Sequence, residues 1–386
     1  MKSSQFDDLR PYCNEEIAPA MRRIAESAAF PQLSSFAYPD RDPEDVKRMI
    51  KSYTTIEEFQ LQAMEAANEQ IIARTIRRFS CEGISKLDKK ACYLFISNHR
   101  DIMLDAALLQ YALHCSGYRT AEITFGSNLM DSPLMIDIGK SNKMFKVIRG
   151  GSGSKDFYRN SLHLSAYIRH TLTEKRESVW IAQRNGRTKD GVDATEQAIV
   201  KMLCMSYPND PVKSLAALNI VPISISYQWE PCDVLKAVEV YHLRRTGAYV
   251  KKSGEDFNSI LTGINGYKGD VHIAVGDVLL EKDFAPLAGL PHNKLSKQVA
   301  LLIDRQVNGS YKLTCNSYIA HDLREQSQRH AARYTSAEKD EFVRRYTSLL
   351  ASDVEDKKML ADIFLGIYAN PVDLKELPDA AKREEI

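Results

Sequence analysis

The spacing of hydrophobic and polar residues divides the chain into a middle part, in which strand and helix patterns alternate, and two helical ends. Short apolar runs typical of buried strands occur at Cys92–Ile96, Thr120–Phe125, Val179–Ile181, Ile220–Ile225, Ala237–Tyr241 and Val271–Val275. Helical periodicity separates several of these runs, at Ile102–His114, Tyr158–Thr173 and Ala194–Met205. Strands separated by helices predict an α/β fold with a largely parallel or mixed sheet flanked by helices.

Both ends of the chain are predicted to be helical extensions of this fold. The N-terminal patterns predict helices at Pro11–Ala29, after the N-cap residue Asp42, and at Thr55–Phe79. The last of these carries Arg74, Arg77 and Arg78, basic residues that suit the C-terminal end of a helix dipole. Helical periodicity returns from Leu295 onward. The predicted organisation is a helical region at 1–85, an α/β domain at 86–285 and a helical region at 286–386.

Composition narrows the class of protein. The 386 residues carry a formal net charge of only +1, so the chain lacks the bulk charge of a nucleic-acid-binding protein. Its seven cysteines have no paired C-x-x-C spacing, which predicts reduced thiols and no metal site. The first residues lack a signal-peptide pattern, and no window of about 18 apolar residues exists. We therefore expect a cytoplasmic protein without a membrane-spanning segment.

The segment Ala91–Leu109 carries the strongest indication of chemistry. Its apolar strand pattern stops at Asn98-His99-Arg100-Asp101, and a helical pattern follows with Asp105 near its start. Open α/β sheets place their ligands at the carboxyl ends of the strands. A histidine there, oriented by a carboxylate, can remove a proton from a hydroxyl group near neutral pH. We predict His99 as this general base, with Asp101 and Asp105 as candidates for the orienting carboxylate, although Asp101 also suits a helix N-cap.

The string NHRDIMLD resembles the first sequence block of the glycerolipid acyltransferases. In that family a histidine and a nearby aspartate deprotonate the hydroxyl of the acceptor, and four residues separate the two in most members. Here five residues separate His99 from Asp105, and a single residue separates it from Asp101. If the chain has a one-residue insertion relative to the family, the resemblance favours Asp105 as the partner.

Three further segments resemble later blocks of that family. The apolar segment Lys143–Arg149 resembles the second block, which implies that Arg149 contacts the phosphate of the acceptor. The turn Arg184–Thr188 resembles the third block and retains Gly186 and Arg187, but Asn185 stands where glutamate is usual. Ile220–Ile225, with its Val-Pro pair, resembles the fourth block, although an ordinary buried strand explains it equally well.

The resemblance implies an O-acyltransferase of phospholipid synthesis. The donor would be an acyl thioester on coenzyme A or acyl carrier protein, and the acceptor a hydroxyl of glycerol 3-phosphate or 1-acylglycerol 3-phosphate. No metal or redox cofactor is required. The implied phosphate ligands are Arg149, Arg184, Arg187 and Gly186, with further substrate contacts from Asn98, Arg100 and Asn185. Guanidinium groups suit this role because they bind phosphate through paired hydrogen bonds.

A lipid substrate also implies contact with a membrane surface. We expect peripheral binding at the inner face of the cell membrane, with Tyr241–Lys252 as the candidate contact because it combines four basic residues with tyrosines. A solvated hairpin tip explains that segment as well, and the N-terminal helices are an alternative docking surface. The missing glutamate leaves two other functions open. One is acyl transfer to a different acceptor, such as an amino-acid lipid, and the other is non-catalytic binding of lipid or acyl carrier.

Overall fold

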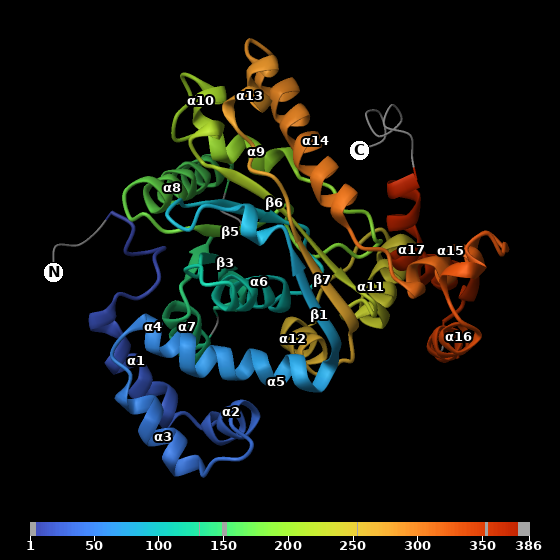
Figure 1. Cartoon of the computed structure of the whole chain (residues 1–386), viewed down its shortest axis with the longest axis horizontal. Helices are drawn as coiled ribbons and strands as arrows, with labels where there is room; N and C mark the ends of the chain where they lie inside the picture. The colour runs from blue at the N-terminus through green and yellow to red at the C-terminus, as the bar shows by residue number, and fades with distance from the viewer. Residues whose placement is uncertain (1–4, 131, 149–152, 253, 352–353, 377–386) are drawn as a thin grey trace.

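The computed structural model describes residues 5–130, 132–148, 153–252, 254–351 and 354–376. Within them, seven strands form one sheet in the order β1-β7-β6-β2-β5-β3-β4 (Figure 1). The strands are β1 (Ile76–Glu82), β2 (Leu94–Ser97), β3 (Glu122–Gly126), β4 (Met144–Val147), β5 (Val179–Ala182), β6 (Ile220–Tyr227) and β7 (Gly269–Val275). All neighbouring strands are parallel except β6 and β7, which are antiparallel. The predicted α/β class with a mixed sheet is confirmed.

Helices cover both faces of the sheet. They are α1 (Asn14–Glu26), α2 (Phe30–Ala37), α3 (Pro43–Ser52), α4 (Ile56–Glu58), α5 (Glu65–Thr75), α6 (Leu104–Cys115), α7 (Pro133–Ser141), α8 (Ser154–Thr173), α9 (Gln197–Cys204), α10 (Pro211–Ala216), α11 (Asp233–Thr246), α12 (Glu255–Asn265), α13 (Glu281–Phe284), α14 (His292–Ser310), α15 (Cys315–Arg324), α16 (Ser336–Leu350) and α17 (Lys357–Glu376). None of the helices in the described part of the chain has the length and apolar character needed to cross a bilayer.

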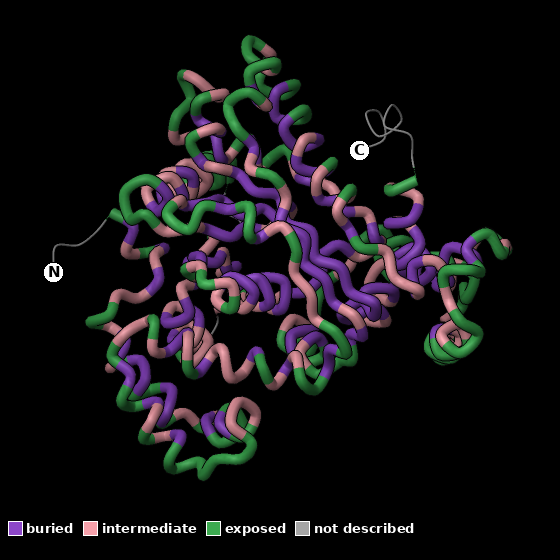
Figure 2. The backbone as a smooth tube through the Cα atoms, in the orientation of Figure 1, coloured by how far each residue is buried: buried purple, intermediate pink, exposed green. Residues whose placement is uncertain are grey.

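The core forms two layers because side chains alternate between the faces of each strand. Leu94 and Ile96 of β2 face a cluster that includes residues of α8, α9 and α14. Phe95 faces the opposite cluster, which includes residues of α5 and α6. These helices lie on opposite sides of the sheet in Figure 1, and the strands between them are buried along most of their length in Figure 2. Burial on both faces explains why the strands read as continuous apolar runs.

The predicted helix Thr55–Phe79 is wrong at its C-terminal end. A π-helical turn interrupts it, and the helix ends at Thr75, where the chain continues directly as β1, parallel to β7. Arg77 and Arg78 therefore do not sit on a helix end. Both form ion pairs with Asp270 of β7, Arg77 at 2.8 Å. No glycine or proline marks the change, because pairing with a distant strand, rather than a local signal, ends the helix.

The prediction of a strand at Ala237–Tyr241 is also wrong, and the short strand β4 was missed. Ala237 and Tyr241 are four residues apart on one face of α11, where they are buried against α17. The segment Tyr241–Lys252 is accordingly the end of a helix and the loop after it, not a hairpin tip. Short apolar runs fit a strand or a buried helix, and only packing decides between them.

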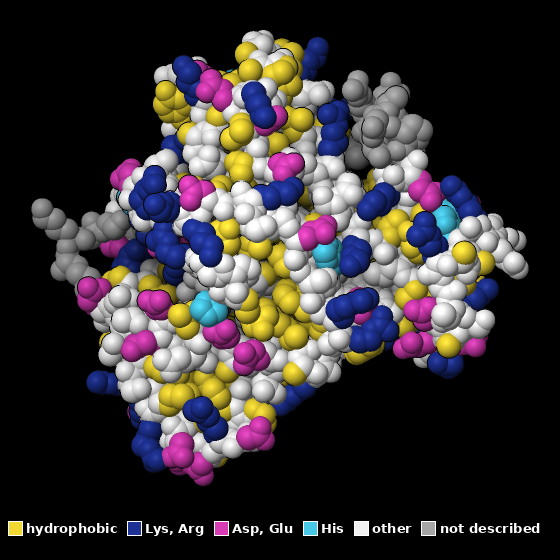
Figure 3. All heavy atoms as spheres, viewed as in Figure 1, with side chains coloured by type: hydrophobic (Ala, Val, Ile, Leu, Met, Phe, Trp, Pro, Cys, Tyr) yellow, Lys and Arg dark blue, Asp and Glu magenta, His cyan; other side chains and the backbone are white. Residues whose placement is uncertain are grey.

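The predicted terminal regions contribute directly to this architecture. Strand β1 from the N-terminal part lies at the sheet edge, and α14 from the C-terminal part packs on β6 and α9. Helices α1 to α3 pack together with α7 in a separate cluster, and α15 to α17 pack together beside α11. On the face shown in Figure 3, basic and acidic side chains are interspersed.

Candidate active site

The predicted site lies on the loop between β2 and α6, at the carboxyl end of a central strand. Asn98 anchors the loop, because its side-chain amide accepts a hydrogen bond from the Ile225 N–H at 2.8 Å and donates to the Ile225 carbonyl at 2.9 Å. The amide thereby extends the pairing of β2 with β6 beyond the last strand residue. A 2.7 Å bond from the Thr188 N–H to the His99 carbonyl fixes the other side of the loop.

His99 contacts Asp105, which lies in the first turn of α6. The distance between His99 Nδ1 and Asp105 Oδ2 is 3.0 Å, and both side chains are buried. The same Oδ2 accepts the backbone N–H groups of Arg100 at 2.6 Å and Asp101 at 2.9 Å. Tyr227 donates its hydroxyl to Asp105 Oδ1 at 2.9 Å. Four donors thus fix the carboxylate, and it fixes the proton of His99 on Nδ1.

The other ring nitrogen of His99 is free to act on a ligand. Within the described residues, Nε2 has no hydrogen-bond partner, and the side chain keeps 10% of its surface exposed. The ring of Trp180 packs edge-on against the imidazole with 6.2 Å between centroids, and its indole N–H is itself bonded to Ser97. The ring orientation of His99 is therefore set from two sides.

Asp101, the alternative partner, has a structural role instead. Its Oδ1 accepts the N–H groups of Met103 and Leu104, both at 2.9 Å, and so caps the start of α6. Its Oδ2 is buried and has no partner among the described residues. Burial and the nearby Asp105 carboxylate raise the pKa of Asp101. A Cβ at Gly263 of α12 would lie 2.2 Å from this oxygen, so glycine permits the close packing.

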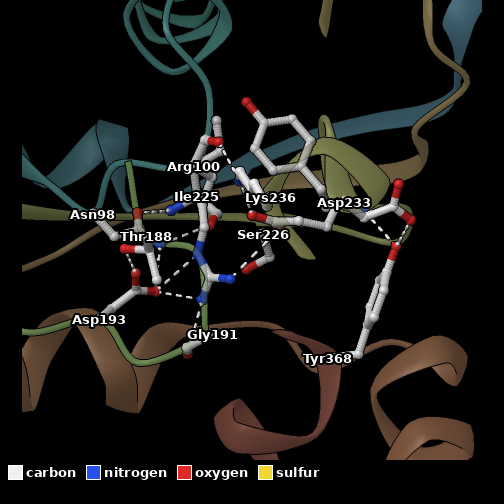
Figure 4. Close-up of polar contacts among 12 residues, drawn as sticks. Asn98, Arg100, Thr188, Gly191, Asp193, Ile225, Ser226, Asp233, Lys236 and Tyr368 are labelled. Atoms are coloured by element: carbon white, nitrogen blue, oxygen red, sulfur yellow. Dashed lines mark hydrogen bonds and ion pairs between the residues drawn. The ribbon is translucent and has the colours of Figure 1, made fainter. Parts of the chain in front are cut away.

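Arg100 is the centre of a buried ionic network (Figure 4). Its guanidinium donates two bonds to Asp193 Oδ2, at 3.1 and 2.6 Å, and reaches Glu230 at 3.4 Å. Lys236 bridges Glu230 and the Arg100 carbonyl with two bonds of 2.6 Å. Burial lowers the pKa of Arg100, but the neighbouring carboxylates outweigh it and hold the pKa well above its ordinary value. These charges are almost fully buried and compensate one another.

This network corrects the prediction that Asn98 and Arg100 contact substrate. Both side chains are fully buried, and Asp193 accepts from both of them. They hold the loop that carries His99 rather than facing a ligand. Sequence reasoning missed Asp193, Glu230 and Lys236, because single charged residues in these segments carry no motif that would reveal their pairing.

The C-terminal helices reach the same region through Asp233 at the start of α11 (Figure 4). Tyr368 of α17 donates to Asp233 at 2.6 Å and accepts the Glu230 N–H at 3.1 Å. Arg345 of α16 adds an ion pair to Asp233. The terminal helices therefore brace the segment that carries Glu230 and Lys236, and through them the His99 loop.

The predicted phosphate ligands have different surroundings. Arg187 is buried and donates to Ser259 of α12 at 3.3 Å, while its Nη1 has no partner among the described residues. Arg184 is partly buried, and its Nε is likewise unpartnered in the part of the chain that the structure describes. Gly186 between them adopts a left-handed φ of 75°, which explains a glycine in this turn. Arg149 lies outside the described residues.

A cavity of about 310 Å³ opens beside the carboxyl ends of β3, β4 and β5. Its lining includes Arg184 and Asn185 together with apolar residues such as Leu164, Ile168 and Met202. His99 is not among its lining residues. However, Ala182 lines it and pairs with Ser97, two residues before His99, so the cavity lies one strand away from the His99 loop.

Comparison with known proteins leaves the function of the chain open. No protein-family model matches the chain, and no curated protein sequence matches it. Among solved structures, it is similar to the crystal structure of the 1-acyl-sn-glycerophosphate (LPA) acyltransferase PlsC from Thermotoga maritima, with 13% identity and a TM-score of 0.37. The alignment covers 78% of this chain and 98% of that one. A likeness at this level carries no argument about what the protein does.

Proposed function

We propose that the protein is an O-acyltransferase that moves a fatty acyl group from a thioester to a hydroxyl of glycerol 3-phosphate or its 1-acyl form. The observation that carries this proposal is the His99–Asp105 pair. Asp105 holds Nδ1 at 3.0 Å and leaves Nε2 without a described partner, at the carboxyl end of a central strand. This is the arrangement that a general base requires.

The proposed reaction has no covalent enzyme intermediate. His99 Nε2 takes the proton of the acceptor hydroxyl as its oxygen attacks the thioester carbonyl carbon. The tetrahedral intermediate then collapses, the carbon–sulfur bond breaks, and the leaving thiolate takes the proton back from Nε2. The products are an ester and a free thiol, and the histidine returns to its starting form. Asp105 stabilises the imidazolium that exists between the two proton transfers.

The arginines of the third segment support an anionic acceptor. The buried Nη1 of Arg187 lacks a hydrogen-bond partner among the described residues, and leaving a buried donor unsatisfied is unfavourable. A phosphate oxygen would satisfy it, as would one near the unpartnered Nε of Arg184. Gly186 gives the turn the backbone conformation that separates these two side chains. The role of Arg149 stays a prediction from the family resemblance.

The apolar cavity supports a fatty acyl group as the other substrate. Leu164, Ile168 and Met202 provide an apolar lining, which also includes polar groups such as Asn185. Apolar pockets with a few polar groups suit amphiphilic ligands. Because a lipid product has to reach a bilayer, peripheral membrane contact and a cytoplasmic location remain part of this proposal. The donor, on coenzyme A or acyl carrier protein, is likewise proposed.

The surface segment predicted to contact lipid head groups gives this proposal limited support. Within Tyr241–Lys252, Arg245 forms an ion pair with Glu355, and Lys251 forms one with Asp256. Charges that are neutralised by neighbouring acids attract anionic lipids less strongly. The N-terminal helices therefore stay open as the alternative docking surface.

The test is transfer of radiolabelled acyl groups from acyl-CoA and acyl carrier protein by the wild type, His99→Ala and His114→Ala. His114 is a matched control, since it lies on α6 with its own carboxylate partner, Glu65, but at the far end of the helix. Acceptors should include glycerol 3-phosphate, 1-acylglycerol 3-phosphate and an amino-acid lipid. We expect loss of about 10²–10⁴-fold in rate for His99→Ala alone.

The same assay separates the competing functions. Transfer only to the amino-acid lipid would show that the enzyme uses a different acceptor, the alternative that Asn185 leaves open. Binding of the acyl donor without transfer to any acceptor would show a non-catalytic binding protein. Equal rates for His99→Ala and wild type would contradict the mechanism.

A further inference from the structure

Two buried histidines lie side by side in the C-terminal part of the chain, away from the His99 loop. His321 belongs to the last turn of α15, and His330 lies in the segment that follows it. The side chains are 6% and 8% exposed, and their ring centroids are 4.9 Å apart. The adjacent Asp322 completes the group. One potential ligand atom from each of the three lies within 4.8 Å of the other two.

Each histidine has a buried ring nitrogen that no described residue satisfies. His321 Nδ1 and His330 Nε2 both lack a hydrogen-bond partner in the described ranges. Glu376 Oε1 lies 3.8 Å from His330 Nε2, which is too long for a hydrogen bond. Leaving a buried polar atom unsatisfied is costly, so two together in one cluster indicate a missing ligand.

The surroundings of the cluster match the outer contacts of a metal site. Asp373 of α17 contacts His321 Nε2 at 3.2 Å, so Nδ1 is the nitrogen left for a ligand. Arg324 in turn binds the other oxygen of Asp373 at 2.6 Å. Metal-binding histidines commonly have a carboxylate on their second nitrogen, because it fixes the tautomer and raises ligand basicity.

Asp322 is held in place by three neighbouring donors. It accepts hydrogen bonds from Ser327 Oγ at 2.8 Å, Tyr334 OH at 2.8 Å and the His330 N–H at 3.0 Å. The hydrogen bond from the His330 backbone N–H also places His330 beside the Asp322 carboxylate.

We propose that His321, Asp322 and His330 bind a divalent transition-metal ion, with zinc as the metal to test first. Two imidazoles and one carboxylate are a ligand set that zinc accepts, with water or a further carboxylate in the fourth position. Glu376 is within reach of that position. Metal–ligand distances of about 2.0–2.2 Å place ligand atoms about 3.3 Å apart, so the three side chains close around the ion by small rotations.

The ion would join α15 and the segment after it, and through Asp373 it would also fix α17. Helix α17 carries Tyr368, which donates to Asp233 beside the ionic network of the His99 loop, and α15 packs on α17. The role of the ion is therefore structural. Cysteine spacing predicted no metal site, but this site uses no cysteine, and the ligand spacing of 321, 322 and 330 is not a recognised zinc motif.

The test uses the full chain after removal of metals with a chelator. Zinc is titrated in competition with a chromophoric chelator, and cobalt is titrated while its visible absorption is recorded. We expect one ion per chain, a cobalt spectrum typical of nitrogen and oxygen ligands, and a higher Tm with zinc. His321→Gln and His330→Gln should weaken binding by at least about 100-fold, and Asp373→Asn by about 10–100-fold.

The control is His292→Gln, at an exposed histidine on α14, which should bind zinc as the wild type does. Circular dichroism without metal establishes that each variant is folded, and Asp373→Asn gives a second readout that leaves all three ligands intact. Absence of one-to-one binding by the wild type would overturn the proposal. Unchanged affinity in both histidine-to-glutamine variants would do so too, because the metal would then be held elsewhere.

Discussion

His99 Nδ1 and Asp105 Oδ2 are 3.0 Å apart although five residues separate the two in sequence. The contact forms because the chain from His99 to Asp101 folds over the start of α6. The N–H groups of Arg100 and Asp101 both donate to the same oxygen that contacts the histidine. This loop conformation accommodates the five intervening residues, so the imidazole of His99 still contacts the carboxylate of Asp105.

We predict that Asp105→Asn and Asp101→Asn differ strongly in activity. Asparagine at 105 does not fix the His99 tautomer reliably or stabilise an imidazolium, so kcat should fall by about 10²–10⁴-fold. Asparagine at 101 keeps the oxygen that caps α6, and it replaces a carboxyl whose pKa is already raised by burial. Its activity should stay within a few-fold of the wild type. Steady-state kinetics of both variants would show a reversed order if Asp101 were the partner.

Tyr227→Phe should lower activity by a smaller amount. The substitution removes the hydroxyl that donates to Asp105 Oδ1 at 2.9 Å, while the ring still fills its buried position. We expect a roughly 3–10-fold lower kcat, with about 1 kcal/mol less stability. Tyr241→Phe is the matched control, since this buried tyrosine contacts the Asp356 N–H and lies outside the site. A similar loss of kcat in both variants would indicate a general effect of stability.

Arg100→Met should destabilise the fold strongly. Asp193 and Glu230 would remain buried without their guanidinium partner, which typically costs about 3–5 kcal/mol. Arg159→Met removes an ion pair with Asp156 in which the arginine side chain is 76% exposed. That change should cost less than about 1 kcal/mol. Urea denaturation measures both, and equal losses would show that the buried network contributes no more than a surface pair.

Asp304 should make stability depend on pH. Burial raises the pKa of Asp304 to about 7, although Thr195 donates two hydrogen bonds to it. Because its pKa is higher in the folded state, the Asp304 carboxyl stabilises the fold at pH values below the unfolded-state pKa of about 3.9. This stabilisation is lost as the pH rises to about 7. Asp304→Asn should remove this loss, which is at most about 4 kcal/mol.

The measurement for Asp304 is the free energy of unfolding at several pH values between about 4 and 8. The difference between Asp304→Asn and the wild type should grow in favour of the variant as the pH rises. The exposed Asp340 provides the control, because Asp340→Asn should follow the wild-type curve. A constant difference between Asp304→Asn and the wild type would contradict the prediction.

The sequence alone determined the central strands and the position of His99. Apolar runs that end in polar residues are local signals, and they placed β2, β5, β6 and β7 within a few residues of their observed bounds. The same signals placed His99 between a strand and a helix. They also indicated the cap at Asp42, whose side chain accepts from Glu44 and Asp45 at the start of α3.

Tertiary structure decided which partners these residues have. Pairing with β7 turns the end of a predicted helix into β1, and packing against α17 makes Ala237–Tyr241 helical rather than extended. Arg100 and Asp193 are 93 positions apart, and His99 is oriented partly by Tyr227 through Asp105. Local patterns encode periodicity and caps, whereas burial and ion pairing depend on residues that only the folded chain brings together.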